Sequence, residues 1–206
     1  MSITVGNIKG GTGKSTTVVF LALLLHSLTG GRVLLIDADK NSQTVSDWSA
    51  QAPDWPEAVV VAGLAVTDLG RKVQAIRGDY DHVVIDTGGH SEEILGQALM
   101  VTDELIVPVA PSPLEIRRLP ATFQVATRVD VISPIAAQVL LVRVGAGDSD
   151  LDASEARALF EQEGVPYMDS YTRQLKGYPR AFGQVPDDFM DYLDVLDELT
   201  APEASA

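Results

Sequence analysis

The sequence predicts an α/β domain with a mostly parallel central sheet and helices on both faces. Short apolar runs alternate with segments of helix length, and most of the runs are continuously apolar, as in strands that are buried on both faces. A chain of 206 residues also suits one hydrophobic core. Right-handed crossovers between parallel strands then place helices on both sides of the sheet. We expect residues 1–200 to form this single domain and residues 201–206 to form a frayed tail.

The expected strands follow from the apolar runs. They are SITVGN (2–7), RVLLID (32–37), AVVVAG (58–63), HVVID (82–86), ELIVPVA (104–110) and AAQVLLVRV (136–144). Amphipathic or apolar segments between and after them predict helices over 15–28, 44–52, 66–77, 92–101, 121–130 and 153–163. The acidic segment 186–200 is amphipathic, and we expect it to pack on the domain, since its charge opposes binding to an anionic membrane.

Composition excludes several classes of protein. The chain has no cysteine, which rules out disulfides, thiolate metal sites and cysteine-held iron–sulfur clusters. No apolar run approaches the ~20 residues of a membrane span, and no basic signal-peptide region opens the chain, so we expect a cytoplasmic protein. Fifteen Lys and Arg against 29 Asp and Glu give a net charge of −14, so any binding to DNA requires a local basic patch.

The stretch KGGTGKS (9–15) carries the strongest chemical signal. Its glycines let successive backbone N–H groups point at a phosphate, and the helix that follows presents its positive end to the same anion. Lys14 is expected to reach the β- and γ-phosphates, and the Ser15 hydroxyl to bind Mg²⁺. The predicted nucleotide-contacting residues of this loop are Gly10, Gly11, Thr12, Gly13, Lys14, Ser15 and Thr16. The alternative is a glycine-rich turn without a ligand.

The loop departs from the common P-loop pattern by having Ile8 at the first glycine position and a second lysine, Lys9. KGGTGKS resembles the deviant Walker A loop of the ParA/MinD family of P-loop NTPases. The resemblance implies ATP-dependent dimers that face each other around two ATP molecules, with Lys9 reaching the phosphates of the partner. A second cation there would neutralise charge on the transferred phosphoryl group. Otherwise Lys9 is a solvated loop lysine.

Two acidic segments agree with this resemblance. DADKN (37–41) is similar to the family's D-x-D segment, with Asp37 as a metal residue and Asp39 as the residue that orients the attacking water. The family usually has Pro-Gln after the second aspartate, where this chain has Lys40 and Asn41. HVVIDTGGH looks like Walker B, with Asp86 as a partner of Mg²⁺ and residues 87–89 as a γ-phosphate-sensing switch.

Residues after the later strands complete the predicted nucleotide site. VAPSPLEIRRL resembles the proline-bearing stretch of small ParF-like (type Ib) plasmid partition ATPases, and it places Pro111 near the adenine. Without the resemblance, these prolines predict only a rigid loop. Arg143 ends a predicted strand and is expected to stack on the adenine or meet phosphate.

The resemblance implies a weak Mg²⁺-dependent ATPase that is stimulated by a small ParB/ParG-like centromere-binding protein. It also implies ATP/ADP as ligands, a homodimer on ATP, non-specific DNA binding, nucleoid association, and a role in plasmid or chromosome partition without a membrane. Positioning of a non-DNA cargo, a metabolic enzyme of the dethiobiotin synthetase type and a non-hydrolysing binding module remain alternatives.

The best candidates for a DNA-binding patch are Arg173, Lys176 and Arg180, which are three bases within eight residues. Arg117, Arg118 and Arg128 form a second set, partly offset by Glu115 and Asp130. Either set could instead be ordinary surface charge.

Overall fold

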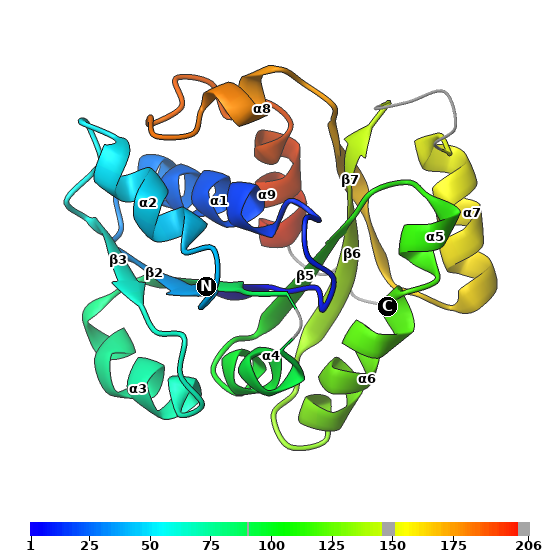
Figure 1. Ribbon diagram of the computed structural model, residues 1–206, viewed down its shortest axis with the longest axis horizontal. Coiled ribbons are helices and arrows are strands. Elements are labelled where there is room, and N and C mark those ends of the chain that lie inside the picture. Colours follow the sequence, from blue (N-terminus) through cyan, green and yellow to red (C-terminus); the bar gives the residue numbers. More distant parts are fainter. Residues whose placement is uncertain (90, 146–150, 202–206) are drawn as a thin grey trace.

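A parallel sheet of seven strands, in the order β3-β2-β4-β1-β5-β6-β7, runs through the described part of the molecule (Figure 1). The structure is a computed structural model that describes residues 1–89, 91–145 and 151–201. The strands are β1 (Ser2–Val5), β2 (Val33–Ala38), β3 (Val59–Gly63), β4 (His82–Thr87), β5 (Glu104–Val109), β6 (Ala136–Val144) and β7 (Tyr167–Arg173). All neighbouring strands within these ranges pair in parallel, which confirms the predicted class of fold.

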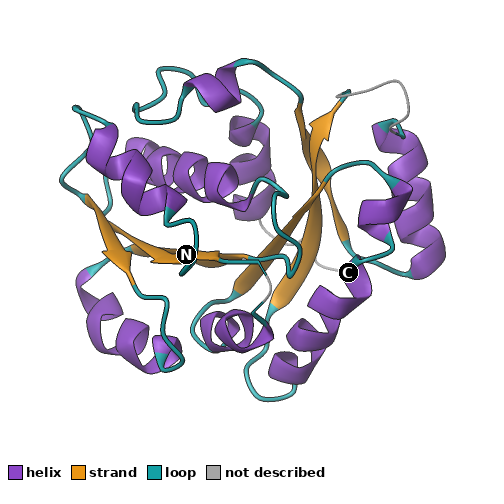
Figure 2. Ribbon diagram, in the orientation of Figure 1, coloured by secondary structure: helices purple, strands orange, loops and turns teal. Residues whose placement is uncertain are grey.

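Helices cover both faces of this sheet (Figure 2). They are α1 (Lys14–Thr29), α2 (Thr44–Gln51), α3 (Leu69–Ile76), the 3-10 turn η1 (Arg77–Asp79), α4 (Glu92–Leu99), α5 (Pro113–Ile116), α6 (Leu119–Asp130), α7 (Ala153–Glu163), α8 (Gly177–Arg180) and α9 (Tyr192–Thr200). Helices α1, α2 and α9 pack on one face, whereas α3, α4, α6 and α7 supply side chains to the cores on the other.

Helix α1 is the centre of the first face because it is apolar almost all round. Ten of its residues are buried, and the Phe20 ring packs 5.0 Å from Tyr192 and 5.3 Å from Tyr178, centroid to centroid. Gly30 ends the helix in the left-handed conformation at φ 67°, which glycine adopts without strain. The helix that follows the glycine-rich loop is therefore held firmly against the sheet and the C-terminal segment.

The last strand, β7, was not predicted. Its sequence YMDSYTR is mostly polar, and only Met168 and Thr172 are buried. The strand lies at the sheet edge, and its pairing with β6 is irregular between residues 167 and 173. The Glu198 carboxylate of α9 accepts hydrogen bonds of 2.7 Å from the backbone N–H groups of Asp169 and Ser170. Helix α9 thus packs on the domain, as predicted for the acidic amphipathic segment.

The parallel arrangement brings the carboxyl ends of the strands to one edge of the sheet, where ligands bind in open α/β sheets. The loops after β1, β2, β4 and β7, together with the end of strand β6, contribute to one pocket at this edge. Among the described helices, none has the length and hydropathy needed to cross a membrane. Residues 202–206 of the predicted tail and residues 146–150 after β6 lie outside the described residues.

Candidate functional site

The glycine-rich loop connects β1 to α1 and forms an exposed cradle. Gly11 and Gly13 take positive φ angles of 75° and 86°, a conformation that costs a residue with a side chain but not glycine. Helix α1 begins at Lys14, directly after Gly13, so its free N–H groups face the loop. This is the geometry that binds phosphate at the N-terminus of a long helix.

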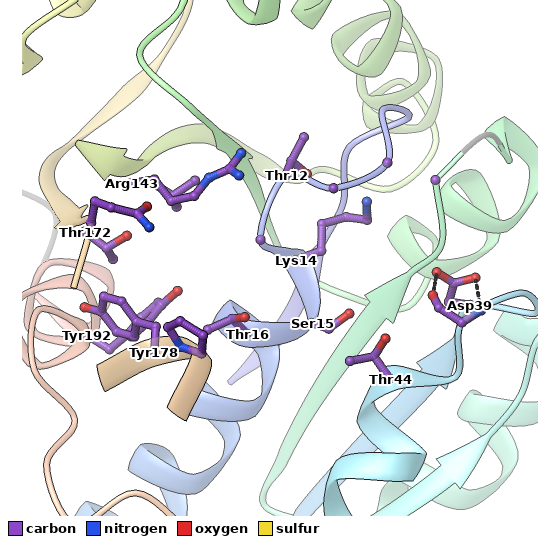
Figure 3. Close-up of a pocket in the computed structure, with 18 of the residues that line it drawn as sticks. Thr12, Lys14, Ser15, Thr16, Asp39, Thr44, Arg143, Thr172, Tyr178 and Tyr192 are labelled. Carbon is purple, nitrogen blue, oxygen red and sulfur yellow. Dashed lines mark hydrogen bonds between the residues drawn. The ribbon is translucent and has the colours of Figure 1, made fainter. Parts of the chain in front are cut away.

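A pocket of about 530 Å³ lies at this loop. Its lining residues are Gly10, Gly11, Thr12, Gly13, Lys14, Ser15, Thr16, Asp39, Asn41, Ser42, Thr44, Gly89, Val142, Arg143, Thr172, Gln174, Leu175, Tyr178, Pro179 and Tyr192. Lys14 and Ser15 lie in the middle, with Asp39 on one side and Arg143, Tyr178 and Tyr192 on the other (Figure 3). The structure thus brings together all seven nucleotide-contacting residues predicted in the loop.

Lys14 is buried, and its Nζ donates a hydrogen bond of 3.0 Å to the backbone carbonyl of Lys9. Burial lowers the pKa of its ammonium, and the Asp86 and Asp39 carboxylates oppose that effect. The loop therefore bends back over its own lysine. A phosphate entering the cradle would offer this ammonium an anionic acceptor in place of a neutral carbonyl.

Asp86, the last residue but one of β4, is buried below the loop, at 1 % exposure. Neither of its carboxylate oxygens has a hydrogen-bond partner among the described residues. Burial raises its pKa to about 7, although the neighbouring Ser15 hydroxyl and Lys14 ammonium favour the charged form. A buried carboxylate without partners is costly, and a cation or a metal-bound water would compensate for it.

Asp37 is the register partner of Asp86 on the adjacent strand β2, but its surroundings are different. Its Oδ2 accepts hydrogen bonds of 2.9 Å from both the backbone N–H and the hydroxyl of Ser46, and its Oδ1 accepts one of 3.2 Å from the N–H of Asp39. Both oxygens are thus occupied in holding the start of α2 and the loop before it. Asp86 is the better candidate for a direct contact with a metal-bound water.

Asp39 lies at the pocket rim, directly after β2. Burial alone would raise its pKa, but the hydroxyl and N–H of Ser42, the N–H of Asn41 and the Lys14 charge outweigh this effect and lower the pKa. Its Oδ1 accepts hydrogen bonds of 2.9 Å from Asn41 and 3.3 Å from Ser42. Asn41, which differs from the usual family residue, and Ser42 thus fix an ionised Asp39 beside the pocket.

The segment after β4 contacts both the phosphate loop after β1 and the Asp39 loop after β2. A Cβ atom at Gly88 would lie 3.0 Å from the Asp39 carboxyl carbon, and one at Gly89 would lie 3.0 Å from the Gly10 backbone. Only glycine permits such close approaches without a shift. Thr87 is buried and donates a hydrogen bond of 3.2 Å to the Val5 carbonyl. The two glycines thus connect the Asp39 loop with the phosphate loop, as expected of a segment that could sense a ligand.

Lys9 lies on the other side of the loop, toward β5. Its N–H donates a hydrogen bond of 2.9 Å to Asn7 Oδ1, while Asn7 Nδ2 donates one of 2.9 Å to the Pro108 carbonyl. The Lys9 ammonium forms an ion pair with the Glu115 carboxylate of α5. Partial burial lowers the Lys9 pKa, and the Arg118 and Arg143 charges lower it further. Glu115 was seen in the sequence only as an offset to nearby arginines, because its pairing with Lys9 depends on how two distant loops meet.

Arg143 and Pro111, the two residues predicted to contact the adenine, differ in their position relative to the pocket. Arg143 lines the pocket at the end of β6 and has a positive φ of 58°, which is unusual for a residue with a side chain. Pro111 does not line this pocket, so its contact with the adenine stays a prediction that the pocket lining does not support. Pro111 is buried, and its carbonyl accepts a hydrogen bond of 2.8 Å from Leu151, because the chain after β5 turns away toward α5 and α7.

The pocket wall from the C-terminal part of the chain was missed. Tyr192 is buried and shares a hydrogen bond of 2.8 Å with Thr17, while Tyr178 donates one of 3.0 Å to Asp191. Burial raises the pKa of both phenols, so they stay neutral. The tyrosines were visible in the sequence, but the strand β7 that brings them to the loop was not predicted.

The three proposed DNA-binding bases lie beside this wall. Arg173 is tied to Asp191, with its Nη2 2.6 Å from Oδ1, whereas Lys176 and Arg180 are exposed at the two ends of α8. Residues 174, 175, 178 and 179, which alternate with them along the chain, line the pocket. The charge of Arg173 is therefore already compensated by Asp191, whereas Lys176 and Arg180 have no salt-bridge partner among the residues that the structure describes.

The site also fits a magnesium ion that accompanies a nucleotide. Within the described residues, no group of three or more His, Asp or Glu side chains could hold a metal alone. Mg²⁺ rarely uses an all-protein cage, and it commonly binds through few side chains together with phosphates and water. The Ser15 hydroxyl in the pocket and the unpartnered Asp86 below it match that need.

Comparison with known proteins agrees with this geometry. Residues 3–176 match the model of the CobQ/CobB/MinD/ParA nucleotide binding domain. Maintenance of carboxysome distribution protein A from Gloeobacter kilaueensis is 32% identical over 182 residues, which cover 87% of this chain and 79% of that protein. Protein ParA from Rhizobium radiobacter is 28% identical over 115 residues, which cover 55% of this chain and 50% of that protein.

The fold has a solved counterpart. The cell division ATPase MinD of Pyrococcus furiosus superimposes with a TM-score of 0.77 over 97% of this chain and 99% of that one, at 20% sequence identity. The fold, the phosphate loop and the family match lead to the same conclusion, that the chain belongs to the CobQ/CobB/MinD/ParA nucleotide-binding family and is a ParA/MinD-type ATPase.

Proposed function

We propose that the chain is a partition ATPase that forms ATP-dependent sandwich dimers, binds non-specific DNA and moves a plasmid or chromosome with a small centromere-binding partner. The observation that carries the proposal is Lys9, a second lysine at the start of a glycine cradle that already contains Lys14. One lysine suffices to bind the phosphates of a nucleotide in cis. A second cation at the exposed loop is suited to a phosphate on another subunit.

In the proposed reaction the Lys14 ammonium and the loop N–H groups hold the β- and γ-phosphates. Ser15 and Asp86 would hold Mg²⁺, which neutralises phosphate charge when it is bound. Asp39, ionised and fixed by Asn41 and Ser42, orients the attacking water. Closure of a second subunit over the exposed loop would exclude solvent and supply the partner's copy of Lys9. Intrinsic hydrolysis would therefore be weak until a partner protein stabilises the closed dimer.

The position of α8 supports a link between nucleotide and DNA. Leu175, Tyr178 and Pro179 line the pocket, and Lys176 and Arg180 stand next to them in the chain. A ligand that orders this segment would also order its two cations. In a symmetric dimer the patch is doubled, which would offset the repulsion expected from a net charge of −14 per chain.

Light scattering with ADP, ATP and a non-hydrolysable ATP analogue tests the dimer. Wild type should dimerise with ATP and the analogue but not with ADP, and Lys9→Ala should stay monomeric while it keeps wild-type affinity for ADP. Lys40→Ala, which removes an exposed lysine beside the pocket, is the matched control and should dimerise normally. Normal dimerisation of Lys9→Ala would contradict the proposed role of Lys9.

A second candidate, positioning of a non-DNA cargo, is favoured by one comparison. The relative that is 32% identical over most of this chain is named for carboxysome distribution. ATPase assays with and without DNA and with a candidate partner separate the two. Stimulation by a centromere-binding protein supports partition. Stimulation of the ATPase by a protein from a cellular particle, with no stimulation by a centromere-binding protein, supports cargo positioning.

A further inference from the structure

The ammonium of Lys9 already has an anionic partner within its own subunit. It pairs with the Glu115 carboxylate, and both side chains are largely shielded from solvent, with 27% and 14% of their side-chain surface exposed. Lys9 lies in the loop after β1, and Glu115 lies in helix α5, which follows the neighbouring parallel strand β5. The pair is therefore built by the sheet and is not a chance contact between long surface side chains.

The backbone on both sides of the pair is fixed. Asn7 bonds to the N–H of Lys9 and to the carbonyl of Pro108, and Thr122 of α6 accepts a hydrogen bond of 3.2 Å from the N–H of Ile8. The loop stem is thus anchored to β5 and α6, which flank Glu115 in the chain. Only the Lys9 side chain has to rotate in order to change its partner.

Leaving the pair has a cost for Glu115. Its Oε2 is buried and has no hydrogen-bond partner in the part of the chain that the structure describes. If the ammonium departs, the carboxylate remains partly buried without its compensating charge, which is unfavourable. Each subunit of a dimer that uses Lys9 across the interface would have to meet this cost.

We infer that Glu115 is a positioning residue that holds the Lys9 ammonium within its own subunit. The cost of breaking this ion pair then weakens ATP-dependent dimerisation and sets its threshold. The inference rests on the proposed function of Lys9 in the dimer. When two ATP-loaded subunits meet, the Lys9 ammonium exchanges the Glu115 carboxylate for a phosphate bound to the partner. ADP lacks the γ-phosphate, so the cost of leaving Glu115 is not offset and the Lys9 ammonium stays paired with Glu115.

The first experiment measures Lys9 in the nucleotide-free protein. The rate at which an amine-reactive acylating reagent modifies Lys9 is followed by peptide mass spectrometry in wild type and Glu115→Gln, and is normalised to Lys40 and Lys72. The variant should raise the Lys9 rate about two- to fivefold, the effect expected of one partly exposed ion pair. In Glu115→Asp, which keeps the charge, the rate of Lys9 modification should fall between those of wild type and Glu115→Gln. A merely structural role would lower thermal stability without changing the relative Lys9 rate, and an unchanged rate overturns the inference.

The second experiment measures dimerisation as a function of protein concentration at saturating ATP. Glu115→Gln should dimerise more tightly, by about two- to fivefold per subunit and the square of that per dimer, with unchanged affinity for ADP. Asp68→Asn, which removes an ion-paired carboxylate at the N-cap of α3, is the control and should match wild type. Equal or weaker dimerisation of Glu115→Gln overturns the inference. If Lys9 reactivity rises in Glu115→Gln but neither wild type nor the variant dimerises with ATP, the ion pair within the subunit is supported. The proposed effect of Glu115 on dimerisation and the proposed function are then both contradicted.

Discussion

The ammonium of Lys14 lies 3.0 Å from the backbone carbonyl of Lys9, so the two lysines of the loop are linked through a backbone atom of one and the side chain of the other. Lys14 faces into the cradle and Lys9 faces away, toward Glu115. The two lysines therefore have different environments, and their substitutions should have different effects.

Lys14→Ala should weaken ATP and ADP binding by about 10²-fold or more, because the phosphates lose a charge-assisted hydrogen bond at a buried position. Isothermal titration calorimetry measures this directly. Lys40→Ala, which removes an exposed lysine outside the pocket lining, should bind like wild type. Equal affinities of the Lys14 variant and wild type would refute the phosphate cradle.

Asp39→Ala should bind ATP and dimerise but hydrolyse about 10²-fold more slowly, because the water loses the carboxylate that orients it. Single-turnover hydrolysis in preformed complexes separates this step from binding. Ser42→Ala, which removes one hydrogen bond to Asp39, should show a smaller loss of rate in the same direction. A wild-type rate in Asp39→Ala would assign the role to another residue.

Asp86→Asn should stabilise the nucleotide-free protein at pH 8 by roughly 1–3 kcal/mol while it weakens Mg²⁺-dependent ATP binding. The folded-state pKa of about 7 lies above the ordinary 3.8, so the folded chain keeps a proton that the unfolded chain releases. This raised pKa makes wild-type stability decrease as the pH rises from about 4 to 7, with no further change above 7. The stabilising effect of the substitution should therefore shrink toward pH 4.

Asp37→Asn supplies the contrast for that measurement. Its carboxylate accepts three hydrogen bonds at similar depth on the adjacent strand, so its replacement should destabilise the protein at pH 8. Urea unfolding at several pH values gives both results. A change in the free energy of unfolding of the same sign for Asp86→Asn and Asp37→Asn would contradict the distinction between a carboxylate without hydrogen-bond partners and a fully hydrogen-bonded one.

Gly89→Ala should reduce nucleotide affinity about three- to thirtyfold, because its Cβ would stand 3.0 Å from the Gly10 backbone and displace the phosphate loop. Gly63→Ala, where a Cβ meets nothing within 4 Å, is the control for a general glycine effect. Fluorescence titration with a labelled nucleotide compares them. If Gly89→Ala binds as tightly as wild type, the segment after β4 is not coupled to the loop.

Neutralising Lys176 and Arg180 to Gln should flatten the salt dependence of DNA binding, since log K falls by about 0.9 for each phosphate contact that is neutralised. Adding Arg173→Gln should change the slope little, because Asp191 already compensates that charge. Arg71→Gln with Lys72→Gln on α3 is the matched control. ATP-dependent binding titrations at several salt concentrations measure the slope, and an unchanged slope would place the patch elsewhere.

The sequence carried most of the fold because its buried strands are continuously apolar. Strand β7 escaped this criterion, since an edge strand with only two buried residues reads as a polar segment. The seven loop residues were predicted from the motif KGGTGKS and Asp39 from the D-x-D segment, because each of these is a short pattern that can be recognised within the chain. The C-terminal wall and the Lys9–Glu115 pair were not, because they depend on contacts between segments far apart in the chain.

The hydrogen bonds that the backbone N–H groups of Asp169 and Ser170 donate to the Glu198 carboxylate have a consequence for self-association. An uncovered edge strand exposes backbone N–H groups on which a strand of another molecule can add, and repeated addition yields aggregates. At this edge the two N–H groups are already occupied by a carboxylate from the same chain, and the irregular pairing of β7 bends the strand. The addition of a strand from another molecule is therefore hindered at β7, and this edge of the sheet is protected from aggregation.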